Sequence, residues 1–229
     1  MTICVIPARG GSKRIPKKNI KLFHGKPMIQ WSIEAARESN IFDTIIVSTD
    51  DDEITELAES LGALVPFKRP TNLSDDYTST TSVISHAALW SIDNKLDSPI
   101  ICCLYATAPF VQPSDLREAH QIITTENWEY VFSAGEYSSP IFRAFEQTNN
   151  GGSKMFFPEN FETRSQDLPK ALFDAGMFYM GTTTAWINNL RIFDEHSFPF
   201  NIPNWRIQDI DTPNDWKQAE QMAKIVLSI

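Results

Sequence analysis

The sequence predicts an α/β fold with a mostly parallel central sheet flanked by helices. Short apolar runs alternate with amphipathic stretches along the first two thirds of the 229-residue chain, as they do when helices cover both faces of a sheet. The stretches between the runs are long enough for crossover helices, which favours parallel pairing. Hydrophobic residues make up 42% of the chain, and a chain of this length should bury about three quarters of its unfolded surface. We therefore expect a single domain over residues 1–229.

The apolar runs and amphipathic stretches give the expected elements in order. The expected strands are 3–6, 45–48, 100–105, 131–133 and 175–180. The expected helices are 28–39, 52–61, 80–90 and 115–124, the last with Ser114 as N-cap and Glu118 close behind. A final helix should begin after Thr212, because Thr212 is a good N-cap, Pro213 suits the first helical position and Asp215 lies in the first turn.

The alternation stops between residues 137 and 172. Pro140, Pro158 and the turn sequence at 149–152 separate short aromatic pieces such as 155–157. We expect this segment to be an excursion from the main sheet.

Composition excludes several classes of protein. Asp plus Glu is 29 and Lys plus Arg is 20, so the net charge is -9, which disfavours nucleic acid as a partner. No apolar run is long enough for a membrane span, and the first apolar run is too short for a signal peptide, so we expect a cytoplasmic protein without a membrane partner. The three cysteines are expected to be buried free thiols, and the four histidines structural or surface residues.

The first segment with recognisable chemistry is 7–19, directly after the first expected strand. It contains two glycines, a serine and five cations, which are Arg9, Lys13, Arg14, Lys17 and Lys18. Backbone N–H groups of a glycine-rich turn can approach phosphate oxygens, while the cations neutralise their charge. The segment lacks the spacing of a P-loop and of a dinucleotide-binding turn. A polyphosphate site is the favoured interpretation, and a solvated basic loop is the alternative.

A second segment, 208–212, carries Asp209 and Asp211 just before the last helix. In an extended strand, residues two apart point to the same face, so both carboxylates could hold one Mg²⁺ beside phosphates. Capping of the following helix by one of these carboxylates is an equally weighted alternative.

A third region has Arg69 and a hydroxyl cluster at 78–81, where helix capping is the commoner role. Residues 107–110 follow the 100–105 strand, at the edge where open α/β sheets bind ligands.

Several of these motifs together resemble the CMP-sialic acid synthetase family, the cytidylyltransferases that activate nine-carbon acidic sugars. The motifs are IPARGGSK at 6–13, KN at 18–19, GKP at 25–27, IVSTD at 46–50, RP at 69–70 and DIDT at 209–212. They occur in family order and span nearly the whole chain. Segments 156–168, 174–176 and 205–209 are most similar to the branch that activates pseudaminic acid.

The resemblance implies a Rossmann-like nucleotidyltransferase sheet and a homodimer in which segment 137–172 lies across the partner subunit. It also implies that CTP and the sugar acid give the CMP-sugar and pyrophosphate with Mg²⁺, by in-line attack of the anomeric hydroxyl on the α-phosphate. By position, the implied catalytic residues are Lys18, Arg9 and Lys13. The implied nucleotide contacts are Ala8, Arg9, Gly10, Gly11, Ser12, Lys13, Asn19, Arg69 and Ser79 or Thr80, and the implied metal ligands are Asp209 and Asp211.

Two departures from the family concern the sugar. Tyr105 stands where sialic acid enzymes carry Gln, and Phe173 stands where they carry Arg, a change that suits a less hydroxylated sugar. Arg164 is the candidate for the substrate carboxylate because an Arg fork binds a carboxylate bidentately, and Gln166 and Gln208 are candidate polar contacts. Other 2-keto sugar acids (sialic, legionaminic or 3-deoxy-octulosonic acid) remain alternative substrates. A nucleotide-binding regulatory module without catalysis and a glycosyltransferase are the alternatives outside this family.

Overall fold

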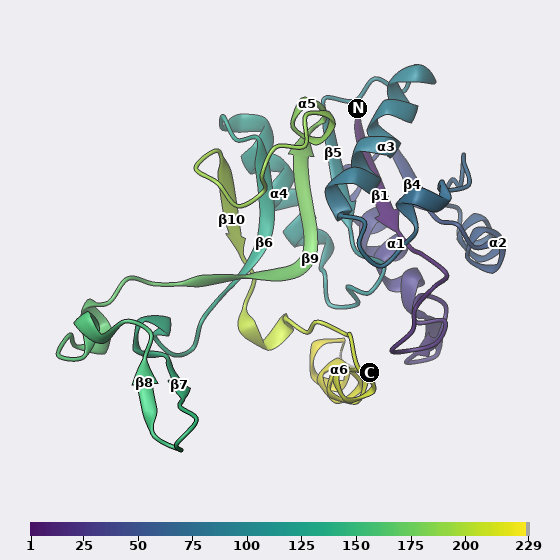
Figure 1. Ribbon diagram of the computed structural model, residues 1–229. Helices are drawn as coiled ribbons and strands as arrows, with labels where there is room; N and C mark the ends of the chain where they lie inside the picture. Colours follow the sequence, from purple (N-terminus) through teal and green to yellow (C-terminus); the bar gives the residue numbers. More distant parts are fainter. Residues whose placement is uncertain (228–229) are drawn as a thin grey trace.

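The computed structural model describes residues 1–227, whose centre is a six-stranded sheet (Figure 1). The strand order is β10 (Ser197–Asn201), β6 (Tyr130–Glu136), β9 (Leu172–Thr182), β5 (Ile100–Leu104), β1 (Thr2–Pro7) and β4 (Thr44–Ser48). Strands β4 and β5 pair parallel with β1, and β10 pairs parallel with β6. Strand β9 is antiparallel to both β5 and β6, so five strands share one direction and β9 opposes them. The expected mostly parallel sheet is confirmed.

Helices lie on both faces of this sheet. Their bounds are α1 (Met28–Ser39), α2 (Asp52–Ser60), α3 (Thr80–Asp93), α4 (Pro113–Thr125), α5 (Thr183–Ile187) and α6 (Pro213–Val226). The expected Thr212 cap is confirmed, since Thr212 Oγ1 accepts a hydrogen bond from the Asp215 N–H while the Asp215 carboxylate accepts from the Thr212 N–H. The expected Ser114 cap of α4 is wrong, because the cap is Gln112 and Pro113 takes the first helical position. The Asp115 carboxylate accepts the Gln112 N–H at 2.9 Å.

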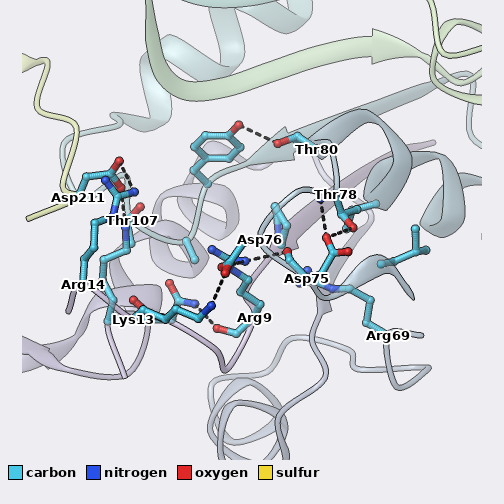
Figure 2. A pocket seen from close by; sticks show the side chains of 18 residues that line it. Arg9, Lys13, Arg14, Arg69, Asp75, Asp76, Thr78, Thr80, Thr107 and Asp211 are labelled. Carbon is cyan, nitrogen blue, oxygen red and sulfur yellow. Dashed lines mark hydrogen bonds and ion pairs between the residues drawn. The ribbon is translucent and has the colours of Figure 1, made fainter. Parts of the chain in front are cut away.

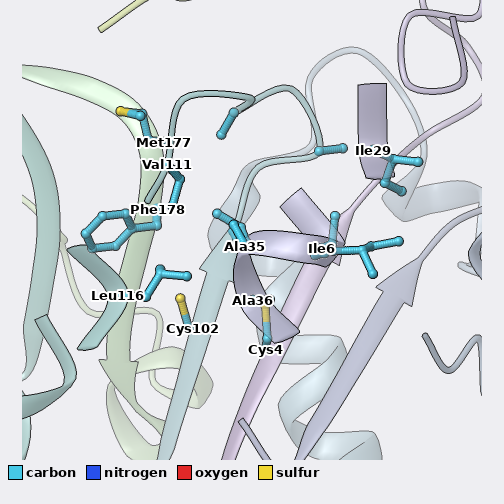
Figure 3. Packing of buried hydrophobic residues seen from close by; sticks show 14 of the residues in the cluster. Cys4, Ile6, Ile29, Ala35, Ala36, Cys102, Val111, Leu116, Met177 and Phe178 are labelled. Atoms are coloured by element: carbon cyan, nitrogen blue, oxygen red, sulfur yellow. The ribbon is translucent and has the colours of Figure 1, made fainter. Parts of the chain in front are cut away.

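Alternation along β1 divides the core into two layers. Cys4 and Ile6 belong to a buried cluster that includes residues of α1, α2, α4 and α6, whereas Ile3 and Val5 belong to a cluster that includes residues of α3 and α5. Figure 3 shows the first layer, where side chains from α1, α4 and β9 meet over β1 and β5. All three cysteines are buried free thiols, as expected.

Several short elements were not expected from the sequence. Besides β10 and α5, they are the hairpin β2 (Leu22–Phe23) and β3 (Lys26–Pro27), the hairpin β7 (Phe145–Gln147) and β8 (Ser153–Met155), and five 3-10 turns. The turns are η1 (Thr71–Leu73), η2 (Ile141–Arg143), η3 (Pro158–Asn160), η4 (Ser165–Asp167) and η5 (Asn204–Arg206).

The chain between β6 and β9 leaves the sheet and forms an arm, residues 137–171, that carries the β7–β8 hairpin (Figure 1). Large apolar side chains on this arm remain exposed, among them Phe145, Phe156 and Phe161. Within residues 1–227, no helix combines the length and the apolar character needed to cross a membrane.

Candidate active site

A cavity of about 550 Å³ lies at the carboxyl ends of β1 and β5. This is the edge at which open α/β sheets bind ligands. Figure 2 shows side chains from the loop after β1, from the 69–80 segment and from Asp211 converging on it. Several residues predicted from the sequence to form a site line this cavity. They are Arg9, Ser12, Lys13, Lys18, Asn19, Arg69, Thr80, Tyr105 and Asp211.

The two cations assigned to a triphosphate share one carboxylate. Arg9 Nη1 lies 2.8 Å from Asp76 Oδ1, and Lys13 Nζ lies 2.5 Å from Asp76 Oδ2. Arg9 Nη1 also donates a hydrogen bond to the Asp75 carbonyl oxygen at 2.7 Å. The hydrogen bond from Lys13 lowers the pKa of Asp76. Sequence reasoning missed Asp76, because nothing in its local sequence distinguishes it from other loop carboxylates.

The backbone of the loop after β1 is held by the neighbouring strand. The Ala8 N–H donates to the Ser48 carbonyl, and the Gly10 N–H donates to Asp50 Oδ1 at 3.0 Å. A Cβ atom on Gly10 would clash with the Asp51 side chain, so glycine is required here for close approach. A Cβ atom on Gly11 would meet nothing within 4 Å. None of these three residues lines the cavity, so the structure gives Ala8 and Gly10 a role in holding the loop.

Two further predicted nucleotide contacts are anchored in the protein. Asn19 is buried and its Nδ2 donates to the Arg9 carbonyl at 3.0 Å, which holds the loop in shape. Arg69 is buried against β4, where it donates to the Ser48 side chain and carbonyl, and burial lowers the pKa of Arg69. Both residues line the cavity with fixed side chains, which lowers the entropic cost of binding a ligand.

The two hydroxyl candidates at the start of α3 have different roles. Ser79 is the helix cap, accepting the Ser82 N–H at 3.2 Å, and it does not line the cavity. Thr80 lines the cavity, and its Oγ1 lies 2.9 Å from the Tyr105 hydroxyl. Burial raises the pKa of Tyr105 to about 12, so this hydroxyl is neutral at physiological pH.

Lys18 and Arg14 meet the Asp211 carboxylate from two sides. Lys18 Nζ donates to the Ile210 carbonyl at 2.6 Å and lies 3.3 Å from Asp211 Oδ1. Arg14 Nη2 lies 2.7 Å from Asp211 Oδ2. Only 18% of the Lys18 side chain is exposed, against 64% of Arg14. The loop after β1 and the segment before α6 therefore form one site.

A second cavity, of about 540 Å³, lies between the start of β9 and segment 204–215. The predicted residues that line it are Phe173, Gln208 and Asp209. Its other lining residues are Glu136, Tyr137, Ser138, Asp174, Ala175, Asn204, Ile207 and Asp215. Asp209 thus lines this second cavity while Asp211 lines the first, so the segment between them connects the two.

Asp209 and Asp211 do not lie in a strand, contrary to expectation, and they line different cavities. Neither caps α6, because Thr212 and Asp215 do so. Desolvation by the surrounding protein, and then the charge of Asp211, raise the pKa of Asp209.

Within residues 1–227, no group of three or more His, Cys, Asp or Glu side chains is arranged to hold a metal ion. Two carboxylates fit Mg²⁺ nonetheless, because this ion commonly takes one or two carboxylates and completes its shell with water and substrate phosphates.

Arg164 and Gln166 are not brought to either cavity of their own chain. Both lie on the arm at η4, and Arg164 Nε pairs with Asp167 Oδ2 at 2.6 Å. Apart from Gly11, which lines neither cavity, the remaining predicted site residues line the first cavity, line the second, or hold the loop and helix that border the first.

The whole chain is similar to known sugar-acid cytidylyltransferases. A family model described as cytidylyltransferase matches residues 3–151. The pseudaminic acid cytidylyltransferase of Campylobacter jejuni is 46% identical, over 97% of this chain and 96% of that protein. The CMP-N,N'-diacetyllegionaminic acid synthase of Legionella pneumophila is 31% identical, over 97% and 96%. A CMP:2-keto-3-deoxy-manno-octonic acid synthetase solved with CTP has the same fold, with a TM-score of 0.72, 18% identity and coverage of 100% and 99%.

Proposed function

The chain belongs to the cytidylyltransferase family, and from this premise we propose that it transfers CMP from CTP to pseudaminic acid and releases pyrophosphate. The observation that carries the proposal is the first cavity, which five cations and three carboxylates line, and where the loop after β1 meets Asp211 from near the other end of the chain. The 46% identity to the Campylobacter jejuni enzyme over nearly the full length of both proteins supports this sugar.

Arg9, Lys13 and Ser12 would bind the triphosphate of CTP. Arg9 and Lys13 already present their donors to the Asp76 carboxylate, an oxyanion with two acceptor oxygens. Phosphate oxygens can accept charge-assisted hydrogen bonds from the same donors. Binding of the nucleotide therefore exchanges Asp76 for phosphate oxygens at the same two cations.

The reaction then requires charge neutralisation and alignment. The anomeric hydroxyl of the sugar attacks the α-phosphorus, the bond from the α-phosphorus to the bridging oxygen breaks, and the hydroxyl proton passes to solvent. Lys18 stabilises the charge that develops on the departing pyrophosphate. Its position is fixed by the Ile210 carbonyl and Asp211, which leaves little side-chain freedom to lose.

Asp209 and Asp211 are proposed to hold Mg²⁺. When bound, the ion would neutralise phosphate charge and favour ionisation of the attacking hydroxyl. Asp209→Asn should keep the fold, because Thr212 and Asp215 still cap α6, and it should lower turnover by orders of magnitude. The measurement is the rate as a function of Mg²⁺ concentration, with helical content followed by circular dichroism. Near wild-type rates at saturating Mg²⁺ would contradict the assignment.

We propose that the arm at residues 137–171 lies across a second copy of the chain in a homodimer, with the reaction taking place in the cytoplasm. The exposed aromatic side chains of the arm would be buried by this contact, and Arg164 and Gln166 would reach the partner's site. Phe145→Asp together with Phe161→Asp should convert the dimer to a monomer in sedimentation equilibrium, whereas Ile225→Asp, an exposed apolar site on α6, should not. A monomeric wild-type protein would contradict the proposal.

The substrate test is pyrophosphate release from CTP and Mg²⁺ with pseudaminic, sialic, legionaminic and 3-deoxy-octulosonic acids. We expect the highest kcat/KM with pseudaminic acid. A higher value with legionaminic acid would favour the activity named for the Legionella pneumophila relative and keep the mechanism. Release with none of the acids would favour a nucleotide-binding regulatory protein.

A further inference from the structure

Arg14 lines the first cavity, and the proposed mechanism gives it no part. Its guanidinium donates from Nη2 to Asp211 Oδ2, and within residues 1–227 this is the only acceptor it contacts. A guanidinium has five N–H donors, so most of its hydrogen-bonding capacity is available to a ligand. With 64% of its side chain exposed, Arg14 is also accessible to one.

The other cations of the cavity are directed elsewhere. Arg9 and Lys13 face Asp76, while Arg69 is buried against Ser48. Figure 2 shows that Lys13 and Arg14, although adjacent in sequence, extend to different sides of the cavity, Lys13 to Asp76 and Arg14 to Asp211. Lys18 shares Asp211 but is mostly buried and also held by a backbone carbonyl. Arg14 is therefore the accessible guanidinium on the side that leads to the second cavity.

The second cavity has the opposite charge. Four carboxylates line it, those of Glu136, Asp174, Asp209 and Asp215, and no Lys or Arg is among its lining residues. Lys170, outside the lining, pairs with Glu136 at 3.2 Å, which leaves three carboxylates without a basic partner within residues 1–227. Such a cavity repels a carboxylate and accepts hydrogen bonds from hydroxyl and amide N–H groups. A sugar acid that spans the junction at Asp209 and Asp211 would therefore turn its carboxylate toward Arg14. Its hydrogen-bond donors would face the carboxylates that are not proposed to hold Mg²⁺, those of Glu136, Asp174 and Asp215.

We propose that Arg14 binds the carboxylate of the sugar acid, while Asp211 orients the guanidinium from its other side. This inference rests on the proposed function. It assigns the carboxylate to Arg14 in place of Arg164 of the same chain, which lies on the arm. In a 2-keto sugar acid the carboxylate is attached to the anomeric carbon, so a bidentate grip on it also aligns the anomeric hydroxyl for attack. Arg14 is thus a specificity-determining residue for acidic sugars.

The test compares the sugar acid with its methyl ester, which lacks the negative charge, in the pyrophosphate-release assay. In wild-type protein the ratio of kcat/KM for acid over ester should be about 10 to 100, the range expected for hydrogen bonds to a charged group. In Arg14→Ala this ratio should fall to near 1, because both substrates lose the same interactions elsewhere. Arg14→Lys should give an intermediate ratio, since a lysine keeps the charge but not the fork. Arg191→Ala, an exposed arginine outside both cavities, should keep the wild-type ratio.

The outcomes separate the inference from the function on which it rests. Absence of turnover by wild-type protein with every sugar acid would contradict the proposed function. If both Arg14→Ala and Arg14→Lys keep the wild-type ratio of acid over ester, the inference alone is overturned. If Arg164→Ala loses this ratio instead, the carboxylate of the sugar acid binds to the arm. A rise in the KM for CTP without a change in the ratio would also overturn it, because Arg14 would then bind the triphosphate.

Discussion

Removal of the Arg206 side chain should destabilise the protein strongly, because it breaks a buried ion pair. Arg206 Nη1 and Nη2 lie 2.6 and 2.8 Å from the two carboxylate oxygens of Asp115, and Nη1 also donates to the Phe110 carbonyl at 3.4 Å. Only 7% of each of the two charged side chains is exposed. The pair fixes η5 to the start of α4, and η5 directly precedes the segment that carries Asp209 and Asp211.

The magnitude follows from what remains after Arg206→Met. Asp115 keeps one N–H partner, that of Gln112 at 2.9 Å, but loses both guanidinium donors while still buried. Loss of one partner of a buried pair costs about 3 to 5 kcal/mol, and the remaining N–H favours the lower end. For a chain of this length that corresponds to a fall in Tm of about 6 to 20 °C.

The assay is equilibrium urea denaturation followed by circular dichroism, with Arg164→Met as the matched control. The Arg164–Asp167 pair is exposed, with 71% and 45% of its side chains accessible, so its loss should cost at most about 1 kcal/mol. Addition of Asp115→Asn to Arg206→Met should restore part of the stability, because the neutral amide leaves no unpaired buried charge. The reasoning is refuted if Arg206→Met and Arg164→Met unfold at the same urea concentration.

Three further predictions concern the nucleotide site, the sugar site and acid stability. Asp76→Asn should lower the KM for CTP, because Arg9 and Lys13 lose a competing carboxylate, and an unchanged or higher KM would contradict this competition. Phe173→Arg should lower kcat/KM for pseudaminic acid while CTP titrations stay unchanged, and unaltered turnover would remove Phe173 from the specificity argument. His86→Phe should make the free energy of unfolding less sensitive to pH between 7 and 5. Desolvation, and then the charge of Arg69, lower the pKa of His86, so the unfolded chain takes up the proton first and wild-type stability falls as pH drops below about 6.5. Equal pH slopes for wild type and variant in urea denaturation would exclude His86 as the cause.

Much of the fold follows from local sequence, because the patterns that mark strands and helix starts involve residues only a few positions apart. The run at 100–104 is apolar at every position, and β5 is buried on both faces, as expected for an inner strand. The start of α6 follows from a capping box whose members are three residues apart. The start of α4 differs from expectation because Pro113 takes the first helical position, which moves the cap to Gln112.

Strand direction and edge strands required the tertiary structure. Nothing in residues 175–180 indicates that β9 runs antiparallel, because its direction depends on where the arm returns the chain to the sheet. Strand β10 contains Pro199, which argues against a strand in the sequence. It is tolerated because β10 lies at the edge of the sheet, where one side of the strand has no partner.

The sequence by itself determined the chemistry of the site: a basic glycine-containing loop after the first strand and two carboxylates before the last helix, both set by residue types within a few positions. Only the tertiary structure decided which charges meet. Lys13 and Asp76 are 63 residues apart in the chain, and Arg14 and Asp211 are 197 apart. Such pairs depend on the sheet that brings their loops to one edge, and adjacent residues of one loop can face different partners. The different positions of Lys13 and Arg14, and with them the inferred carboxylate site, are therefore properties of the fold.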